Sequence, residues 1–175
     1  MAPLITQTSM DGSVAIFSPC MRYRYSLRRR WANGPRLGFM MLNPSTADAF
    51  QDDPTVRKCI GFAKRLNFGA IEVLNLWAIR STDPAGVLAV DDPIGADNNR
   101  LIRESKERNL ETIAAWGAHA TGMLKRIGPA RIRDVLAILR ATPHLVSCLG
   151  RSADGSPRHP LMLPYSSQIS VYGGV

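Results

Sequence analysis

Four short apolar segments, separated by helical patterns, limit the folds that this 175-residue chain can adopt. Each segment is mostly apolar and does not alternate strictly, as is typical of strands buried on both faces of a parallel sheet. The four segments are residues 37–42, 71–76, 112–116 and 144–149. We therefore expect an α/β fold, a three-layer α/β/α sandwich with a central, mostly parallel four-stranded sheet.

Helical patterns fill the spaces between these segments. Residues 53–66 begin with Asp53-Pro54, a favourable N-cap and first-turn pair, and carry apolar residues at helical spacing. Shorter helices are expected at residues 97–109, 122–126 and 130–140.

The region before the first apolar segment has a different character. Residues 14–31 predict two short strands around Ser18-Pro19. We expect one domain over residues 1–175, with a basic strand extension at 1–36 and an α/β core at 37–165.

The charge of the chain favours a nucleic-acid partner without requiring one. Lys and Arg number 22 against 14 Asp and Glu, which gives a net charge of +8, and only four of the cations are Lys. Arg is suited to forked contacts with phosphate groups. Residues 21–40 contain six Arg and no acid, so we expect DNA as the partner.

Other protein classes are excluded by missing features. No apolar run approaches the ~18 residues that a membrane span needs, and the N-terminus does not resemble a signal peptide. The three cysteines are far apart and form no CxxC, so we expect buried free thiols, no metal site and a cytoplasmic location. P-loop, GxGxxG and GxSxG motifs are absent, and we expect no cofactor.

Polar residues stand where the predicted strands end. Asn43-Pro44-Ser45 follows the first apolar segment, Asn75 lies in the second, His119 follows the third, and Arg158-His159 lies beyond the fourth. Active sites of parallel sheets gather at the carboxyl ends of the strands, so we expect these residues to share one site.

Three strings at these strand ends resemble motifs of the uracil-DNA glycosylase superfamily. FMMLNPSTADAF resembles the first motif, in which an apolar strand ends in Asp-Pro or Asn-Pro. IEVLNL is similar to the second strand, and RHPLMLP resembles the late His-Pro motif. The chain also resembles a family of bacterial and phage proteins with the same LNPSTAD and RHPL strings, which implies no activity.

The resemblance implies catalytic roles for two residues. Asn43 matches the position that orients the attacking water, and His159 matches the histidine that stabilises negative charge on the departing base. Position 43 is Asn and not Asp, as in the mismatch-specific branch, so a strong base is missing there. Asp48 is a candidate to supply it, although Asp also caps helices and turns readily.

The resemblance also implies a base-binding pocket. Asn75 matches the residue whose amide pairs with the base edge, and Phe50 is the candidate that stacks on the base. Pro44 precedes Ser45, which stands where the strict uracil branch has a Tyr that crowds carbon 5 of the base. A small residue there favours pyrimidines with substituents at carbon 5.

Arginines near the predicted strand ends are candidates for contacts with the DNA backbone. The alternative for the run at 28–30 is a solvated turn. The candidates are Arg28, Arg29, Arg30, Arg80 and Arg158.

The sequence therefore predicts a DNA glycosylase that hydrolyses the N-glycosidic bond of a flipped-out uracil or 5-substituted pyrimidine. Its role would be base-excision repair or defence against phage, and single-stranded DNA or an easily flipped base would be its target. Two alternatives stay open, namely a catalytically weak nucleic-acid-binding protein and an enzyme that acts on free nucleosides or nucleotides.

Overall fold

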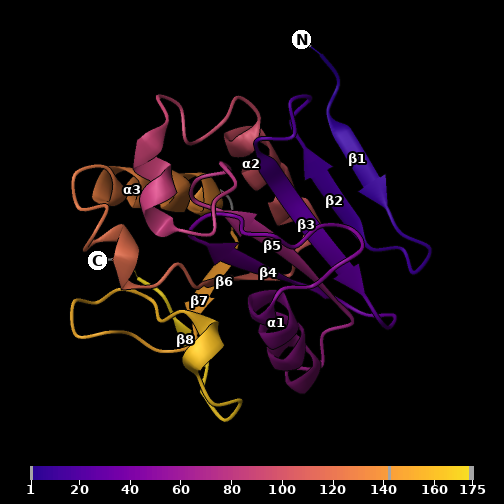
Figure 1. Cartoon of the computed structure of the whole chain (residues 1–175). Helices are drawn as coiled ribbons and strands as arrows, with labels where there is room; N and C mark the ends of the chain where they lie inside the picture. Colours follow the sequence, from indigo (N-terminus) through magenta and orange to yellow (C-terminus); the bar gives the residue numbers. More distant parts are fainter. Residues whose placement is uncertain (1, 142, 174–175) are drawn as a thin grey trace.

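A computed structural model of the chain describes residues 2–141 and 143–173. These residues form one eight-stranded mixed sheet with the strand order β1-β2-β3-β5-β4-β6-β7-β8 (Figure 1). The strands are β1 Ile5–Thr8, β2 Val14–Phe17, β3 Arg24–Arg30, β4 Arg36–Met41, β5 Ala70–Asn75, β6 Glu111–Ala114, β7 Leu145–Cys148 and β8 Ser170–Val171.

The pairing pattern confirms the α/β class but corrects the expected sheet. The adjacent strands β5, β4, β6 and β7 run parallel to one another. The other four of the seven pairings between described strands are antiparallel. The prediction of a mostly parallel four-stranded sheet was therefore wrong, because the basic N-terminal strands pair onto β5 and a short C-terminal strand pairs onto β7.

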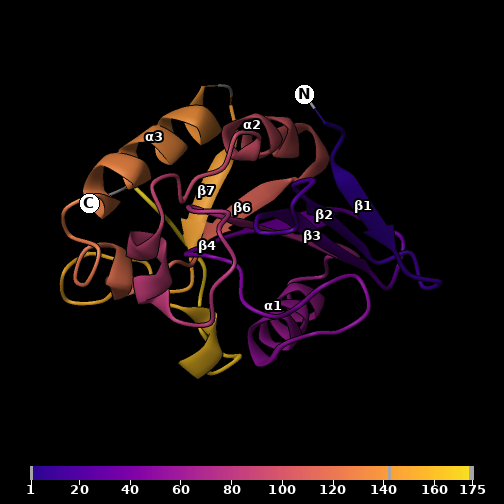
Figure 2. The same cartoon turned by 45° about the horizontal axis from the view of Figure 1, so that its top comes forward.

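Helices cover both faces of this sheet. Helix α1 (Pro54–Arg65) lies on one face, and α2 (Asn98–Arg108) and α3 (Gly128–Arg140) lie on the other (Figure 2). Successive residues of a strand point to opposite faces, so Phe39 packs in the cluster that contains α1 residues, and Met40 packs in the cluster of α2 and α3.

Local sequence signals explain where the helices begin. The side chain of Asp53 accepts a hydrogen bond from the backbone N–H of Val56 at 2.8 Å, and Pro54 occupies the first turn of α1.

Short 3₁₀ helices occur at Pro84–Ala89, Ala118–Ala120 and Pro160–Met162. The helix expected at 122–126 was wrong. That segment is a turn between Ala118–Ala120 and α3, since so short a segment cannot offset the cost of helix nucleation.

The cysteines differ in exposure. Cys59 and Cys148 are buried free thiols, whereas Cys20 is exposed, so the expectation of burial was wrong for Cys20. None of the helices in the described part of the chain has both the length and the apolar character that crossing a bilayer requires.

Candidate functional site

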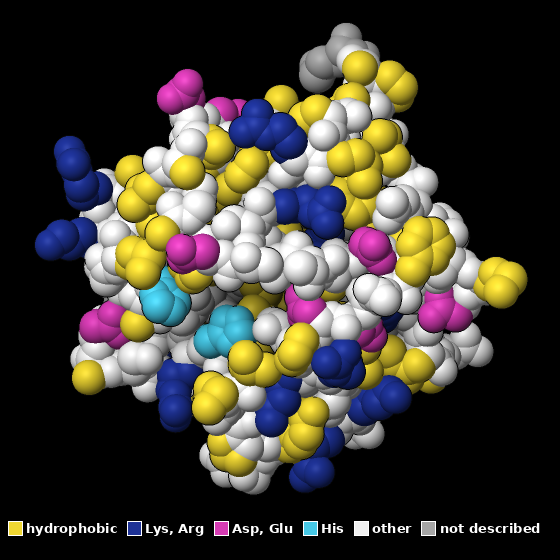
Figure 3. Space-filling view, viewed as in Figure 1, with side chains coloured by type: hydrophobic (Ala, Val, Ile, Leu, Met, Phe, Trp, Pro, Cys, Tyr) yellow, Lys and Arg dark blue, Asp and Glu magenta, His cyan; other side chains and the backbone are white. Residues whose placement is uncertain are grey.

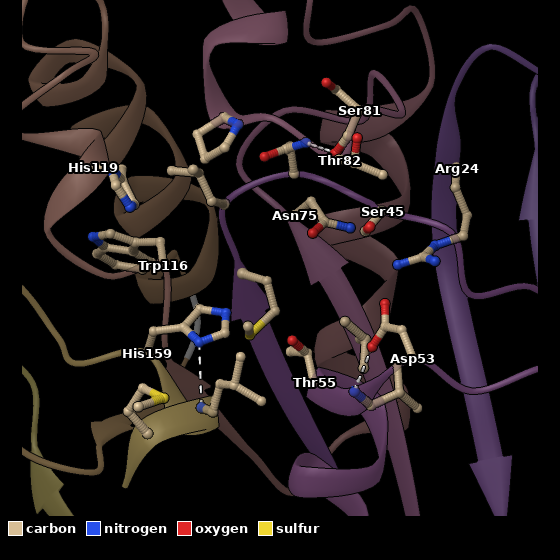
Figure 4. Close-up of a pocket in the computed structure, with 18 residues that line it drawn as sticks. Arg24, Ser45, Asp53, Thr55, Asn75, Ser81, Thr82, Trp116, His119 and His159 are labelled. Carbon is tan, nitrogen blue, oxygen red and sulfur yellow. Dashed lines mark hydrogen bonds between the residues drawn. The ribbon is translucent and has the colours of Figure 1, made fainter.

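A cavity of about 470 Å³ lies where the parallel strands β4, β5 and β6 end (Figure 4). The face drawn in Figure 3 shows a hollow bordered by two histidine side chains, with Lys and Arg spread around the edge of that face. The residues that line the cavity are Arg24, Met41, Leu42, Asn43, Ser45, Asp53, Thr55, Val56, Val73, Asn75, Ser81, Thr82, Pro84, Trp116, His119, His159, Leu161 and Met162.

His119 lines this cavity as expected, and so do four of the predicted catalytic and base-binding residues, namely Asn43, Ser45, Asn75 and His159. These four come from three segments of the chain that lie far apart in sequence. Hydrogen bonds beyond the strands hold these segments together. Leu76 N–H donates to the carbonyl oxygen of Met41, and Ser81 N–H donates to that of Pro44. The structure thus places these four residues together, while their chemical roles remain predictions.

Asn75 is the most unusual side chain of the cavity. It ends β5, is 1% exposed, and neither its Oδ1 nor its Nδ2 has a hydrogen-bond partner among the described residues. Buried amides are normally paired, and an unpaired polar group costs about 1–3 kcal/mol. Both unpaired atoms belong to a residue that lines the cavity, so a ligand bound there is a candidate partner for the amide. The Nε1 of Trp116, another residue of the lining, is also buried without a partner in the described part of the chain.

The backbone on either side of this amide is firmly held. Asn98 Nδ2 donates to the carbonyl oxygens of Asn75 and Leu76 at 3.1 and 3.2 Å, and Arg131 Nε donates to that of Leu76 at 2.6 Å. Asn98 and Arg131 are both buried, and burial lowers the pKa of Arg131 to about 10, which leaves it charged at neutral pH. The role of these two residues could not be predicted from the sequence, because they lie among the polar positions of α2 and α3.

The amide of Asn43 is held in one orientation. Its Nδ2 donates to the carbonyl oxygen of Ser81 at 2.8 Å and to that of Pro44 at 3.3 Å. With its donors occupied, the amide oxygen is the atom left to accept a hydrogen bond, for example from a water.

His159 is held as one tautomer. Its Nδ1 accepts a hydrogen bond from the backbone N–H of Leu161 at 3.2 Å, so the proton of the neutral ring sits on Nε2. Burial lowers the pKa of His159, and the charge of His119 acts in the same direction, while Asp53 opposes both. His159 is therefore a neutral ring at pH 7 with one N–H to donate.

Arg24 enters the cavity through an irregularity in the sheet. In the β2–β3 pairing, Ile16 faces Ser26 but Phe17 faces Arg24, so Tyr25 is an extra residue on β3. Such a bulge shifts by one residue the alternation of side chains between the two faces of the sheet. It places Arg24 on the side of Phe17, where its Nη1 donates to the carbonyl oxygen of Ala47.

Asp48, Phe50 and Pro44 are not among the residues that line the cavity. The carboxylate of Asp48 accepts hydrogen bonds from the backbone N–H groups of Phe50 and Gln51, at 2.8 and 3.0 Å, and so closes a turn. Phe50 is 64% exposed and borders a different hollow. The carboxylate in the cavity is Asp53, which the sequence identifies only as a helix cap.

The predicted DNA-backbone arginines do not gather at the cavity. Arg28 lies about 10 Å along β3 from Arg24, because the two residues face Val14 and Phe17 of β2, which are three residues apart. Arg28 pairs with the buried Glu72 at 3.1 Å, and Arg29 pairs with Asp52 at 2.8 Å. Both guanidinium groups are thus engaged in ion pairs within the protein, while their predicted role in binding phosphate stays a prediction.

The other three candidate arginines take part in none of the ion pairs between described residues. Arg30 is exposed at the far end of β3 and donates to the carbonyl oxygen of Ala32. Arg80 lies 5.2 Å from the ring centroid of Phe17 and donates to the carbonyl oxygen of Met21. Arg158 is exposed and directly precedes His159.

Burial alone would raise the pKa of Glu72, but the Arg108 hydrogen bond and the charges of Arg28 and Arg108 hold it below its ordinary value. Glu72 thus stays ionised as the partner of these arginines. Within residues 2–141 and 143–173, no three His, Cys, Asp or Glu side chains are grouped to hold a metal ion.

Comparison with known proteins gives one match. No curated protein and no solved structure matches the chain. A family described as a protein of unknown function (DUF1643) matches residues 24–161, and both ends of the match, Arg24 and Leu161, line the cavity. Since the match covers most of the chain, including the ends of all four parallel strands, the protein belongs to the DUF1643 family.

Proposed function

We propose that this protein is a DNA glycosylase, a divergent relative of the uracil-DNA glycosylase superfamily. It would hydrolyse the N-glycosidic bond of a flipped-out uracil or 5-substituted pyrimidine. The observation that carries the proposal is the buried amide of Asn75, whose two unpartnered atoms belong to a cavity that also contains Asn43 and His159.

The proposed reaction transfers the base to water. The oxygen of a water molecule bonds to C1′ of the sugar as the bond from C1′ to N1 of the base breaks. The electron pair of that bond leaves with the base, and the base takes up overall the proton that the water loses. The products are a free base and an abasic sugar with a hydroxyl group on C1′.

Three side chains would divide this work. The amide oxygen of Asn43 would accept a hydrogen bond from the attacking water. The Nε2–H of His159 would donate to the base oxygen where negative charge develops, and a preorganised donor of this kind is worth about 2.7–4 kcal/mol. Asp53 would stabilise the positive charge that develops on the sugar, since it is an acid of the lining.

Base recognition would rest on Asn75. An amide presents one acceptor and one donor, and so it complements either a uracil-like or a cytosine-like edge. Ser45 leaves room beside carbon 5 of the base. A nucleotide that enters this cavity must leave the base stack, so single-stranded DNA or a mismatched base is the favoured substrate. Repair of damaged DNA and defence against phage with modified bases are the corresponding roles.

Activity on a free nucleotide is the second candidate. The engagement of Arg28 and Arg29 in ion pairs favours it, because a guanidinium held in an ion pair is less free to contact a DNA backbone. Inclusion of 2′-deoxyuridine and its 5′-monophosphate as substrates would separate the two.

Base release from oligonucleotides tests the proposal. Each single-stranded oligonucleotide carries one uracil or 5-substituted pyrimidine, and free base is measured by mass spectrometry beside alkali-labile strand breaks. We expect His159→Gln to lower the rate about 100-fold. His144→Gln is the matched control, because His144 is hydrogen-bonded to Thr112 and does not line the cavity. Salt-sensitive DNA binding without base release would favour the binding-protein alternative instead.

A further inference from the structure

Arg24 places a buried cation beside the base-binding part of the cavity. Its side chain belongs to a residue that is 2% exposed, and its Nε has no hydrogen-bond partner among the described residues. None of the ion pairs in the described part of the chain includes Arg24. An ionised group that is buried without a counter-ion is costly, so this position favours a ligand with negative charge.

The charges around Arg24 do not neutralise it within the protein. Burial lowers its pKa to about 10, and Arg80 and Arg29 act in the same direction, while Asp53 and Asp48 oppose them. Arg24 is therefore cationic at neutral pH. Asp53 is close enough to influence Arg24, but one of its oxygens accepts from Val56 N–H, and none of the ion pairs between described residues joins it to the guanidinium.

The direction of Arg24 connects it to Ser45. In the view of Figure 4, Ser45 lies between Asn75 and the guanidinium of Arg24, and all three line the same cavity. A base paired with Asn75 that turns its carbon 5 towards Ser45 would therefore direct a substituent at that carbon towards Arg24.

We propose that the pyrimidine released by this protein carries an anionic group on its carbon-5 substituent, and that Arg24 binds that group. This inference rests on the proposed glycosylase function. Carboxylate and phosphate groups share the required chemistry, because a guanidinium binds the oxygens of either through parallel N–H bonds. Arg24 is then the residue that selects the substituted base over plain uracil.

A purely structural role is the alternative for Arg24, since its Nη1 binds the carbonyl oxygen of Ala47. Arg29 provides a matched control. It also lies on β3 and donates to carbonyl oxygens of the same loop, those of Asp48 and Gln51, but it does not line the cavity. Arg29→Gln thus weakens the attachment of the loop and leaves the proposed anion site in place.

The test compares two bases of nearly equal shape that differ in charge. Oligonucleotides carry either 5-carboxymethyluracil or its neutral amide, 5-carbamoylmethyluracil, and the ratio of their release rates is measured. We expect the wild-type protein to favour the carboxylate about tenfold or more, as one charge-assisted contact implies. Arg24→Gln should abolish this preference, Arg24→Lys should keep part of it, and Arg29→Gln should keep all of it.

Several outcomes would overturn the inference while leaving the glycosylase function intact. Release of both bases at equal rates by the wild-type protein is one. Equal loss of the preference in Arg24→Gln and Arg29→Gln is another, because it would assign Arg24 to the loop alone. If the preference for the carboxylate persists in Arg24→Gln, its cause is the chemistry of the leaving base and not Arg24.

If no base is released and the proposed function fails, nucleoside binding to the protein still tests the inference. Calorimetry would compare 5-carboxymethyl-2′-deoxyuridine, its amide and 2′-deoxyuridine 5′-monophosphate on the wild-type and Arg24→Gln proteins. Tighter binding of the carboxylate nucleoside that requires Arg24 supports the inference. Binding of the monophosphate alone would place the anion on the sugar and overturn it.

Discussion

Asn43 donates a hydrogen bond from Nδ2 to the backbone carbonyl oxygen of Ser81 at 2.8 Å. This bond joins the loop after β4 to the loop after β5, on the rim of the cavity. It gives a physical reason for Asn at this position, because a carboxylate there would face the carbonyl oxygen with no proton to share.

Asn43→Asp should therefore impair the protein rather than supply the missing base. We expect base release to fall and the free energy of unfolding to decrease by about 0.5–1.5 kcal/mol, the net contribution of one hydrogen bond between part-buried groups. Urea unfolding and the oligonucleotide assay measure the two effects. Asn67→Asp makes the same chemical change at an exposed residue and should alter neither. A faster reaction in Asn43→Asp would contradict this account.

Asn75→Leu should separate stability from activity. Leu has the same branched arrangement of heavy atoms, its larger methyl groups can extend into the cavity, and it removes two buried polar atoms that lack partners, so the melting temperature should stay unchanged or rise. Base release should fall at least about 100-fold. Asn98→Leu is the contrasting variant. Its Nδ2 serves two backbone carbonyl groups, so that variant should lower the melting temperature. A large loss of stability in Asn75→Leu would mean that the amide is paired within the protein.

Asp53 and Asp48 should differ when each is changed to Asn. Asn caps helices about as well as Asp, so Asp53→Asn should keep the bond to Val56 N–H and change stability by only a few tenths of a kcal/mol. It removes a negative charge from the cavity, and the rate of base release should fall about tenfold. Asp48→Asn keeps a turn acceptor outside the cavity and should leave the rate unchanged. The opposite ranking would restore Asp48 as the catalytic base.

The neutral form of His159 predicts a loss of both activity and stability in acid. Burial lowers its pKa below the ordinary value of 6.5, so the unfolded chain binds its proton at a higher pH than the folded chain does. The free energy of unfolding is therefore highest above pH 6.5 and falls as the pH drops from 6.5 through the folded pKa. Protonation of Nδ1 also removes the acceptor for Leu161 N–H.

Urea unfolding and base release between pH 5 and 8, the range in which His titrates, would measure both effects. His159→Gln should reduce the pH dependence of stability. Part of it should remain, because burial, together with Lys106, lowers the pKa of His144 as well. Stability that is independent of pH in this range would contradict the inference.

The apolar segments predicted the four parallel strands to within a residue or two at most ends, because such segments can be buried only between two layers of helices. The same pattern cannot show how many further strands join the edges. Pairing of the Arg-rich β3 with β5 depends on partners remote in sequence, including the ion pair of Arg28 with Glu72.

The candidate site, too, could be predicted from the sequence only in part. Asn43, Ser45, Asn75 and His159 could be predicted, since they stand at the ends of parallel strands or in the loop that follows them, and such ends share one edge of a sheet. Asp48 and Asp53 could not be distinguished, because both are acids in one loop and only the packing of α1 decides which of them lines the cavity.

The sequence by itself thus determined the α/β class, the edge of the sheet where polar residues collect, and the amides and histidine found there. Only the tertiary structure decided which cation accompanies them. The predicted arginines at 28 and 29 are held in ion pairs, whereas one extra residue in β3 turns Arg24 into the cavity. A bulge depends on how two strands pair, and so its effect on a single side chain follows from the sheet rather than from the order of residues.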